Sequence, residues 1–444
     1  MPIGPRLKTG RVVPALAVLL TLPAALDVCR AAAEEEAVET RQALWERLRQ
    51  QKFRALRPPE QGFVERRVLA LEKAEHPGLL AWSVGGFYPR VQSIGWGSQT
   101  AVGARFWQPD IKGTKMDVHA AAFHSIRRYE SYELQVGVLP HRGPALPARS
   151  TQGDDVYELG SIRRRSGRQG LAYASLRYRH LPEVDFFGLG TDSRPADQTT
   201  FLLQDAWYDL VVGYQPTSRT AITARAGLMQ AFVGPGRDEE LPTTQQLFDE
   251  RQVPGLTRQP DFLHLTVLGL LDGRDQPGNP HSGAMLALSA SRFDDRDSEA
   301  YAFDRLGADG RAFVPLGSTQ RVLALRALVS ADRPADGSRV PFFLQETLGG
   351  SHTLRGYRSF RFRGEKLLLL QAEYRWEAAP AVELAAFVDG GRVASHLADW
   401  SLRDLRTSYG LGLRIKSHDR VILRFDVGRS TEETRLLLRV GESL

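Results

Sequence analysis

From about Gln99 onward, apolar and polar residues alternate along one short segment after another. In the clearest segment, 420–427, alternate positions form an apolar set and a largely charged set: Val421, Leu423, Phe425 and Val427 against Arg420, Ile422, Arg424 and Asp426. Because successive side chains of a β-strand point to opposite faces, this period of two predicts strands with one apolar and one charged face. Such strands need a different environment on each side of their sheet.

The pattern predicts about sixteen strands, an even number in the range of bacterial outer-membrane barrels. Residues 368–376, 382–389, 409–416 and 434–440 repeat the alternation, with charged side chains on the polar face of each. The full set of candidate strands is 98–108, 114–126, 130–139, 155–164, 169–180, 199–214, 219–230, 261–271, 283–293, 299–314, 319–330, 365–377, 381–389, 407–416, 419–428 and 433–441.

Two architectures give every strand a charged face and an apolar face. In a secreted β-sandwich the charged face is solvated, whereas in a transmembrane barrel it lines the lumen and the apolar face contacts lipid. A mean hydropathy of −0.30 and 25% charged residues exclude a bundle of transmembrane helices but not a barrel. Aromatic residues such as Tyr374 and Trp376, together with long connections rich in proline and glycine, favour the barrel. We therefore predict an all-β fold, a transmembrane antiparallel β-barrel over residues 91–444.

An export signal supports this choice. The long apolar run from Val12 to Leu26 follows three basic residues and precedes the small-residue stretch 31–33. This arrangement predicts a secretory signal peptide over residues 1–33. Cys29, the single cysteine of the chain, would be removed with it, so we expect a mature protein without disulfides. Asp27 and Val28 ahead of Cys29 do not fit a lipoprotein box.

Residues 34–90 differ from the rest of the chain. Segments 34–57 and 63–75 carry apolar residues at helical spacing and end before Pro58 and Pro77, respectively. We predict a short helical lead-in over 34–90. Its two helices either pack loosely in the periplasm or enter the barrel and plug it.

The connections between strands fall into short and long groups. Lys112-Gly113 and Ser417-His418 have the character of periplasmic turns. The long connections 140–154, 181–198, 231–260, 331–364 and 390–406 have the character of surface loops. This asymmetry is typical of outer-membrane hairpins.

Two short glycine-containing motifs lie in this setting. Leu354-Arg355-Gly356-Tyr357 resembles the [VIL]-R-G-[FY] signature of the Omp85 superfamily (surface antigen D15 type, the family of BamA and TamA). Phe387-Val388-Asp389-Gly390-Gly391 resembles its [GF]-x-D-x-G signature. In that family the first motif lies in the sixth extracellular loop, which folds back into a sixteen-stranded barrel, and the second lies on the thirteenth strand. The strand count places the two motifs after strands eleven and twelve, in agreement with the family.

Three further segments extend the resemblance over roughly residues 85–441. Residues 410–414 and 424–428 look like the last strands of the family and contribute a late-strand motif. The residues of that motif are Gly410, Gly412, Arg414, Arg424 and Asp426. Segment 185–193 resembles a stretch that is common in the barrel-only members.

The resemblance implies a contact between Arg355 and Asp389. The alternation puts Asp389 on the lumen face, where an unpaired carboxylate would be poorly solvated, and a guanidinium on an inward-folding loop offers a planar fork for it. We expect Gly356 to permit a tight turn and Gly391 to keep the strand end free of side chains. The predicted lumen lock is structural rather than catalytic. Its residues are Arg355, Gly356, Tyr357, Phe387, Asp389 and Gly391.

The chain also departs from the family pattern in two ways. Residues 34–90 are too few for a convincing POTRA domain, so we expect a barrel-only member. The chain ends at Leu444 without the terminal aromatic residue of an outer-membrane assembly signal. This predicts either a relaxed signal or extra residues beyond the last strand.

No sequence pattern indicates catalysis or a cofactor. The ten histidines are scattered, and His119 and His124 would face opposite sides of one strand. The pair Ser351-His352 lacks a G-x-S-x-G elbow, and no phosphate-binding or dinucleotide motif is present. Arg163-Arg164-Arg165 suits a barrel rim or a lipid phosphate. We expect no enzyme activity, no cofactor, no metal and no nucleic-acid partner.

Three functions remain open. The first is a barrel that assists the insertion or translocation of substrates at the outer membrane, and the second is a passive pore or structural barrel. The third is an outer-membrane enzyme such as a lipase, in which Ser351 would be the nucleophile. The expected location is the bacterial outer membrane, and the expected form is a monomer. The expected partners are outer-membrane lipid, lipopolysaccharide and possible clients such as unfolded outer-membrane proteins.

Overall fold

The structure is a computed structural model that describes residues 47, 86–92, 94, 101–139, 170–396, 402, 404–416 and 421–440. The chain divides into two compact units, Met1–Gly62 and Phe63–Leu444, and the account below concerns the second. Several predicted features lie outside the described residues. They are the signal peptide 1–33, the lead-in helices apart from Arg47, candidate strand 155–164, residues 163–165 and the last residues 441–444.

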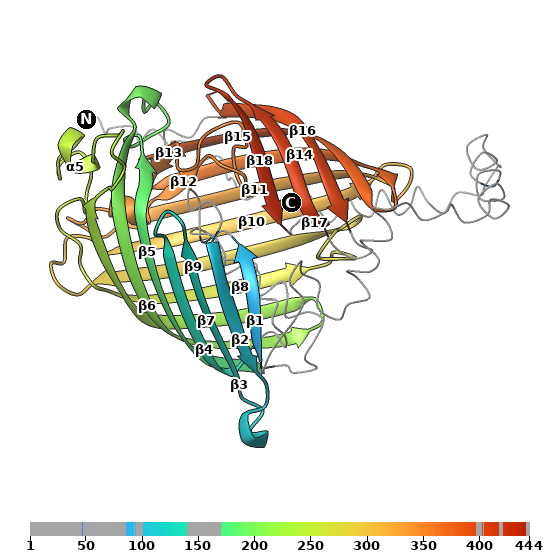
Figure 1. The fold of residues 1–444 in the computed structure, drawn as a ribbon, viewed down its shortest axis with the longest axis horizontal. Coiled ribbons are helices and arrows are strands. Elements are labelled where there is room, and N and C mark those ends of the chain that lie inside the picture. The colour runs from blue at the N-terminus through green and yellow to red at the C-terminus, as the bar shows by residue number, and fades with distance from the viewer. Residues whose placement is uncertain are drawn as a thin grey trace, which may run out of the picture. The chain divides into compact units, whose positions relative to one another are not determined.

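Sixteen strands form one antiparallel sheet in which each strand pairs with the next along the chain (Figure 1). They are β1 (Phe87–Gln92), β2 (Ala101–Gln108), β3 (Asp117–Ser125), β4 (Glu130–Val138), β5 (Gly170–Phe186), β6 (Thr199–Thr217), β7 (Thr220–Pro235), β8 (Phe262–Asp272), β9 (Gly283–Asp295), β10 (Phe303–Pro315), β11 (Arg321–Pro334), β14 (Lys366–Ala379), β15 (Val382–Ala394), β16 (Arg406–Lys416), β17 (Val421–Arg429) and β18 (Thr434–Val440).

Short elements occupy some of the connections. The pair β12 (Glu346–Leu348) and β13 (Phe362–Gly364) forms a separate two-stranded sheet between β11 and β14. The short helices are η2 (Ile111–Gly113), η3 (Pro195–Asp197), α5 (Thr244–Leu247) and η4 (Phe342–Leu344). Within the described residues, none of the helices has the length and hydrophobicity that crossing a bilayer requires.

The sheet curves round on itself. Thr191 follows β5, the fifth strand, and Val393 lies on β15, the thirteenth strand in the hydrogen-bonding order. In a flat sheet at ~4.8 Å per strand, the eight spacings between these strands would put the two residues roughly 38 Å apart. Instead the Thr191 hydroxyl donates to the Val393 carbonyl at 2.6 Å and accepts from the Val393 N–H at 3.0 Å. The fold is therefore the predicted all-β antiparallel barrel.

The predicted strand faces are confirmed. On β16, Leu411 is 67% exposed, while Arg414, which points to the other face, is 1% exposed. On β17, Phe425 and Val427 are exposed while Asp426 between them is buried. The charged residues of alternating strands thus line the interior, and the apolar residues form the outer surface.

Among the described residues the sheet has the predicted sixteen strands, but β1 was not in the predicted set, and candidate 155–164 lies outside the described residues. The prediction ends the lead-in at residue 90, whereas Phe87–Gln92 forms β1 and pairs with β2. Pro89 interrupts the alternation of this segment. Proline lacks a backbone donor and is confined to edge strands or bulges, and β1 is an edge of the sheet.

The long connections gather at one end of the sheet. The antiparallel order brings the connections after β5, β7, β9, β11, β15 and β17 to the same end. The strands reach further into these connections than predicted, since β5 extends to Phe186 and β7 to Pro235. The connection that contains 140–154 joins β4 to β5 at the opposite end, contrary to its predicted grouping with the others.

An aromatic core fills the interior near this end. Each of β5, β6, β8, β9 and β10 places a buried phenylalanine within three residues of its end. These residues are Phe186, Phe201, Phe262, Phe293 and Phe303. Phe342 of η4 packs among them, with its ring 4.8 Å from that of Phe201 and 5.2 Å from that of Phe186. A fully buried side chain of this size contributes about 1.5–3 kcal/mol to stability. Because the rings contact one another, the interior is packed here rather than open.

A charge placed on the outer face tests the assignment of the two faces. We expect Leu411→Lys, midway along β16, to lower the free energy of unfolding in lipid by about 2–4 kcal/mol, because the ammonium would lie in hydrocarbon. Leu402→Lys is the matched control, since Leu402 is equally exposed but lies in the connection before β16. Urea titrations followed by tryptophan fluorescence would measure both. Equal effects of the two substitutions would contradict a lipid-facing β16.

Candidate functional site

The connection between β11 and β14, residues 335–365, folds into the barrel and carries the first predicted motif. Leu354, Arg355 and Tyr357 are each no more than 1% exposed. This segment is called the inner loop below. Because its backbone cannot be solvated there, it depends on contacts with the surrounding strands.

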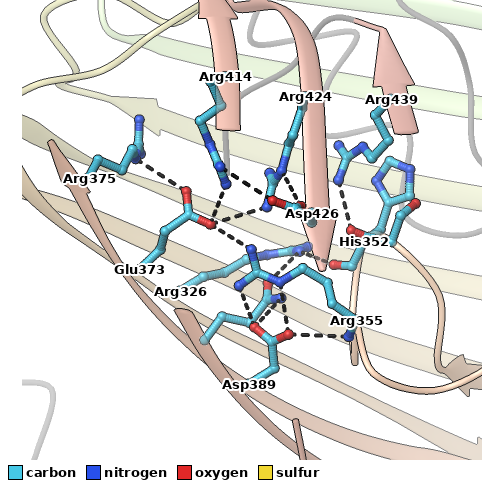
Figure 2. A network of polar contacts seen from close by, with 12 residues as sticks. Arg326, His352, Arg355, Glu373, Arg375, Asp389, Arg414, Arg424, Asp426 and Arg439 are labelled. Carbon is cyan, nitrogen blue, oxygen red and sulfur yellow. Dashed lines mark hydrogen bonds and ion pairs between the residues drawn. The ribbon is translucent and has the colours of Figure 1, made fainter. Parts of the chain in front are cut away.

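Arg355 binds Asp389 of β15 through two parallel hydrogen bonds. Its Nε and Nη2 donate to the two carboxylate oxygens at 2.9 and 2.6 Å, and its backbone N–H adds a third bond at 3.2 Å. Gln371 and Ser408 donate to the same carboxylate. The contact that the resemblance implies is thus present (Figure 2), and each oxygen of the buried Asp389 carboxylate accepts at least two hydrogen bonds.

Glu373 of β14 is the centre of a larger network. Its Oε2 accepts hydrogen bonds from Arg355 at 2.5 Å, Arg414 at 2.8 Å and Arg424 at 3.1 Å (Figure 2). Arg375 lies 3.5 Å from the other oxygen. The alternation within 368–376 places Glu373 on the charged face of its strand, but Glu373 was not among the predicted site residues. Glu373 lies on the same face of its strand as Gln371 and Arg375, and this period of two was the signal that could have found it.

Asp426 of β17 joins the late-strand motif to this network. Arg424 donates to one of its oxygens at 2.6 Å and Arg414 to the other at 3.3 Å. Gly412 makes room for this arrangement, because a Cβ there would lie 2.2 Å from both Arg414 Nη1 and Asp426 Oδ1. Glycine at this position is required by the neighbouring charged groups.

Gly410 has the same relation to Phe387. A Cβ at Gly410 would lie 2.5 Å from the ring of Phe387 and 2.0 Å from the Val427 carbonyl. The ring of Phe387 in turn supports Arg355, whose Cζ lies 3.4 Å from the ring centroid. Phe387, predicted to face the lumen, is therefore a stacking partner of the buried guanidinium.

The glycines of the inner loop and of β15 act through close approach. A Cβ at Gly356 would lie 2.6 Å from the backbone of Arg429, and one at Gly391 would lie 2.9 Å from Leu348. Gly356 lies in a tight turn, as predicted, which the Tyr357 N–H closes by donating to the Leu354 carbonyl at 3.1 Å, but it does so without a positive φ. Gly391 lies within β15 rather than at a strand end, and its lack of a side chain lets the inner loop pack on the strand.

Two further contacts hold the inner loop. The Tyr357 hydroxyl lies 3.2 Å from that of Thr431, between β17 and β18. Arg361 donates to the Ser193 hydroxyl and carbonyl at 2.8 and 2.7 Å. Ser193 belongs to the segment 185–193 that the sequence analysis singled out by resemblance alone. The structure assigns this segment a packing role against the inner loop.

The tip of the inner loop is held on its other side. The Ser351 carbonyl accepts a hydrogen bond from Arg439 of β18 at 2.8 Å, and the His352 carbonyl accepts one from Arg326 of β11 at 3.2 Å. Arg326 is itself paired with Asp309 of β10 through two bonds of 3.1 and 2.9 Å. Figure 2 shows these anchors beside the Arg355 network.

The arrangement is one of mutual charge neutralisation. Burial, and then the positive charges of Arg439 and Arg326, lower the pKa of His352 well below its usual value, so this imidazole is neutral at pH 7.

On β3, His119 is buried and His124 exposed, so they face opposite sides as predicted. In the described part of the chain, no group of three or more His, Cys, Asp or Glu side chains could hold a metal ion.

Comparison with known proteins identifies the fold. Residues 259–435 match the model of the Omp85 superfamily domain. The crystal structure of BamA from Haemophilus ducreyi lacking POTRA domains 1–3 is 14% identical with a TM-score of 0.55, over 80% of this chain and 68% of that one. CdiB from Escherichia coli is 11% identical with a TM-score of 0.48, over 80% and 62%. No match was found among curated proteins.

Removal of the Arg355 side chain tests the network. Arg355→Ala would leave Asp389 and Glu373 buried with fewer partners, and we expect it to lower the free energy of unfolding by about 3–5 kcal/mol. Arg358→Ala is the control, because Arg358 lies in the same loop but is half exposed in its contact with Glu433, and its loss should cost at most ~1 kcal/mol. Folded yield on heat-modified gels and urea titration would measure the effect. Normal yield and stability of Arg355→Ala would refute the lock.

Close approach at Gly356 gives a second test. We expect Gly356→Ala to cost about 1–3 kcal/mol, because the new methyl group would push the inner loop away from β17. Gly269→Ala on β8 is the matched control, since no atom lies within 4 Å of a Cβ at that position. The same urea titrations apply. A Gly356→Ala protein as stable as Gly269→Ala would show that the loop can move aside freely.

Proposed function

We propose that this chain, a β-barrel of the Omp85 superfamily, resides in a bacterial outer membrane and helps client polypeptides to insert into that membrane or to cross it. The outward apolar face of strands such as β16 supports the membrane location, because these residues need a lipid environment. The proposed role is not enzymatic. The proposed partners are lipid, lipopolysaccharide and unfolded outer-membrane proteins, and the proposed form is a monomer.

The observation that carries the proposal is the filled interior. The inner loop occupies the barrel, and its Arg355 is fixed by charged partners on two strands. A passive pore needs a continuous water path, which this loop and the aromatic core obstruct. An activity that takes place in the wall of the barrel, by contrast, is compatible with a plugged interior.

The edges of the sheet supply a candidate place for that activity. In the hydrogen-bonding order of the described strands, β1 and β18 stand at the two ends. With six and seven residues they are also the shortest strands of the sixteen. A seam between two short strands, β1 and β18, would have few hydrogen bonds to break. An edge strand also presents free backbone groups to which a client strand can pair. We propose that clients engage the barrel at this seam.

The alternative function is a passive pore or a structural barrel without insertase activity. It is kept because a shared fold does not by itself fix a function. The two functions differ in what the cell loses when the protein is removed.

Depletion followed by proteomics of the outer membrane tests the proposal. We expect the abundance of other outer-membrane proteins to fall severalfold and to be restored by the wild type and by Arg358→Ala, but not by Arg355→Ala. An unchanged outer-membrane proteome after full depletion would refute the insertion role.

Conductance distinguishes the alternative. In a planar bilayer we expect the wild-type barrel to show no steady open current, because its inner loop stays in place. Arg355→Ala, if it folds, should show frequent openings. Steady current through the wild type, together with an unaltered proteome, would establish the passive pore instead.

A further inference from the structure

The inner loop leaves part of the interior unfilled. The Arg355 network fixes it to the wall formed by β14–β17, and a cavity of about 250 Å³ borders it on the side of β5–β11. At ~30 Å³ per molecule, this volume equals that of about eight waters. It is separate from the Arg355 network, whose residues do not line it.

Arg363 of β13 borders this cavity and has no carboxylate partner among the described residues. It is 3% exposed, its Nη1 donates to the Phe342 carbonyl at 2.6 Å, and its Nε has no hydrogen-bond partner. Burial lowers the pKa of Arg363 to about 9, so the guanidinium still carries its charge at pH 7. A buried cation is costly unless an anion accompanies it.

Aromatic rings surround the Arg363 guanidinium instead. Its Cζ lies 5.7–5.9 Å from the ring centroids of four phenylalanines, which are Phe186, Phe201, Phe342 and Phe360. Phe360 has a φ of 60°, a left-handed conformation that large side chains rarely adopt. Ring faces stabilise a cation weakly compared with a carboxylate, so the cage holds the guanidinium in place without neutralising it.

The other charges that line the cavity are accounted for. Each lining carboxylate has an arginine partner: Asp205 pairs with Arg179, Asp309 with Arg326 and Glu346 with Arg305. Six arginines and three carboxylates line the cavity in all, an excess of positive charge that Asp209 beside Arg225 and Asp332 beside Arg305 reduce. Of the remaining three arginines, Arg225 lies 3.8 Å from Asp209 and Arg177 lies over the Trp207 ring. The excess therefore includes Arg363, and it favours an anion.

The cavity also has an extended apolar wall. Leu203, Met229, Phe293 and Phe343 line it and belong to the same hydrophobic cluster as the rings around Arg363. An alkyl chain that starts at Arg363 can thus stay in contact with apolar side chains. A site that combines a few placed polar groups with apolar walls is typical of small-molecule pockets.

We propose that this cavity binds an anionic amphiphile, with the anionic head accepting hydrogen bonds from Arg363 and a short alkyl chain lying along the apolar wall. The head is a carboxylate or a phosphate, from a fatty acid or a lipid fragment respectively. This site is independent of the insertion activity and uses none of the residues of the Arg355 network.

Binding of decanoate tests the proposal. The full barrel is placed in nanodiscs of uncharged phosphatidylcholine and titrated by calorimetry, with the heat of empty discs subtracted. We expect decanoate to bind at least 10-fold more tightly than decanol, because only the anion forms a charge-assisted hydrogen bond. Arg363→Gln should weaken decanoate binding by roughly 10- to 100-fold and leave decanol binding unchanged. Decyl phosphate in place of decanoate distinguishes the two sources of the head group.

Two variants keep the test decisive. Arg258→Gln, at an exposed loop position away from the cavity, should bind decanoate like the wild type. Leu203→Trp should fill the cavity and abolish binding while Arg363 remains, which covers the case that Arg363→Gln does not fold on heat-modified gels. Equal binding of decanoate and decanol by the wild type overturns the proposal. So does unchanged decanoate binding by folded Arg363→Gln or by Leu203→Trp.

Discussion

The hydrogen bonds between Arg355 and the carboxylates of Asp389 and Glu373 are the contact on which the interior of this barrel depends. Two strands contribute acids that are fully buried, and leaving either carboxylate unpaired would be strongly destabilising. The guanidinium can bind both at once because its five donors lie in one plane. The inner loop is therefore drawn into the barrel by the charges on the wall.

Steric demands follow from that ion pair. Arg355 can reach its partners only if the backbone of the loop approaches β17 closely, and Gly356 and Gly428 meet at that approach. Gly410 and Gly412 free the space that Phe387 and Arg414 use. The glycines of the motifs thus serve the charged network by leaving out side chains.

The two sides of the interior differ in whether their arginines have carboxylate partners. On the side of β14–β17, arginines and carboxylates interleave, and the Glu373 carboxylate serves several guanidinium groups. On the side of β5–β11, Arg363 stands within aromatic rings without an acid. On the first side the charged groups pair with one another. The second side retains a cavity and positive charge. A plugged barrel with a residual cationic cavity is the structural setting for both proposals.

Much of this architecture follows from local pattern. Alternation along a strand determined the fold class, the number of strands and the lumen position of Asp389, Arg414 and Arg424, because the pleat forces neighbouring side chains to opposite faces. It could not show β1, in which Pro89 breaks the pattern.

Which groups contact one another could be learned only from the tertiary structure. Which carboxylate meets Arg355, why Gly356 is needed and how 185–193 packs on the inner loop depend on groups far apart in the chain. Strand register and loop placement bring them together. A sequence indicates which face a side chain occupies, but only the curvature of the sheet decides what it meets across the interior.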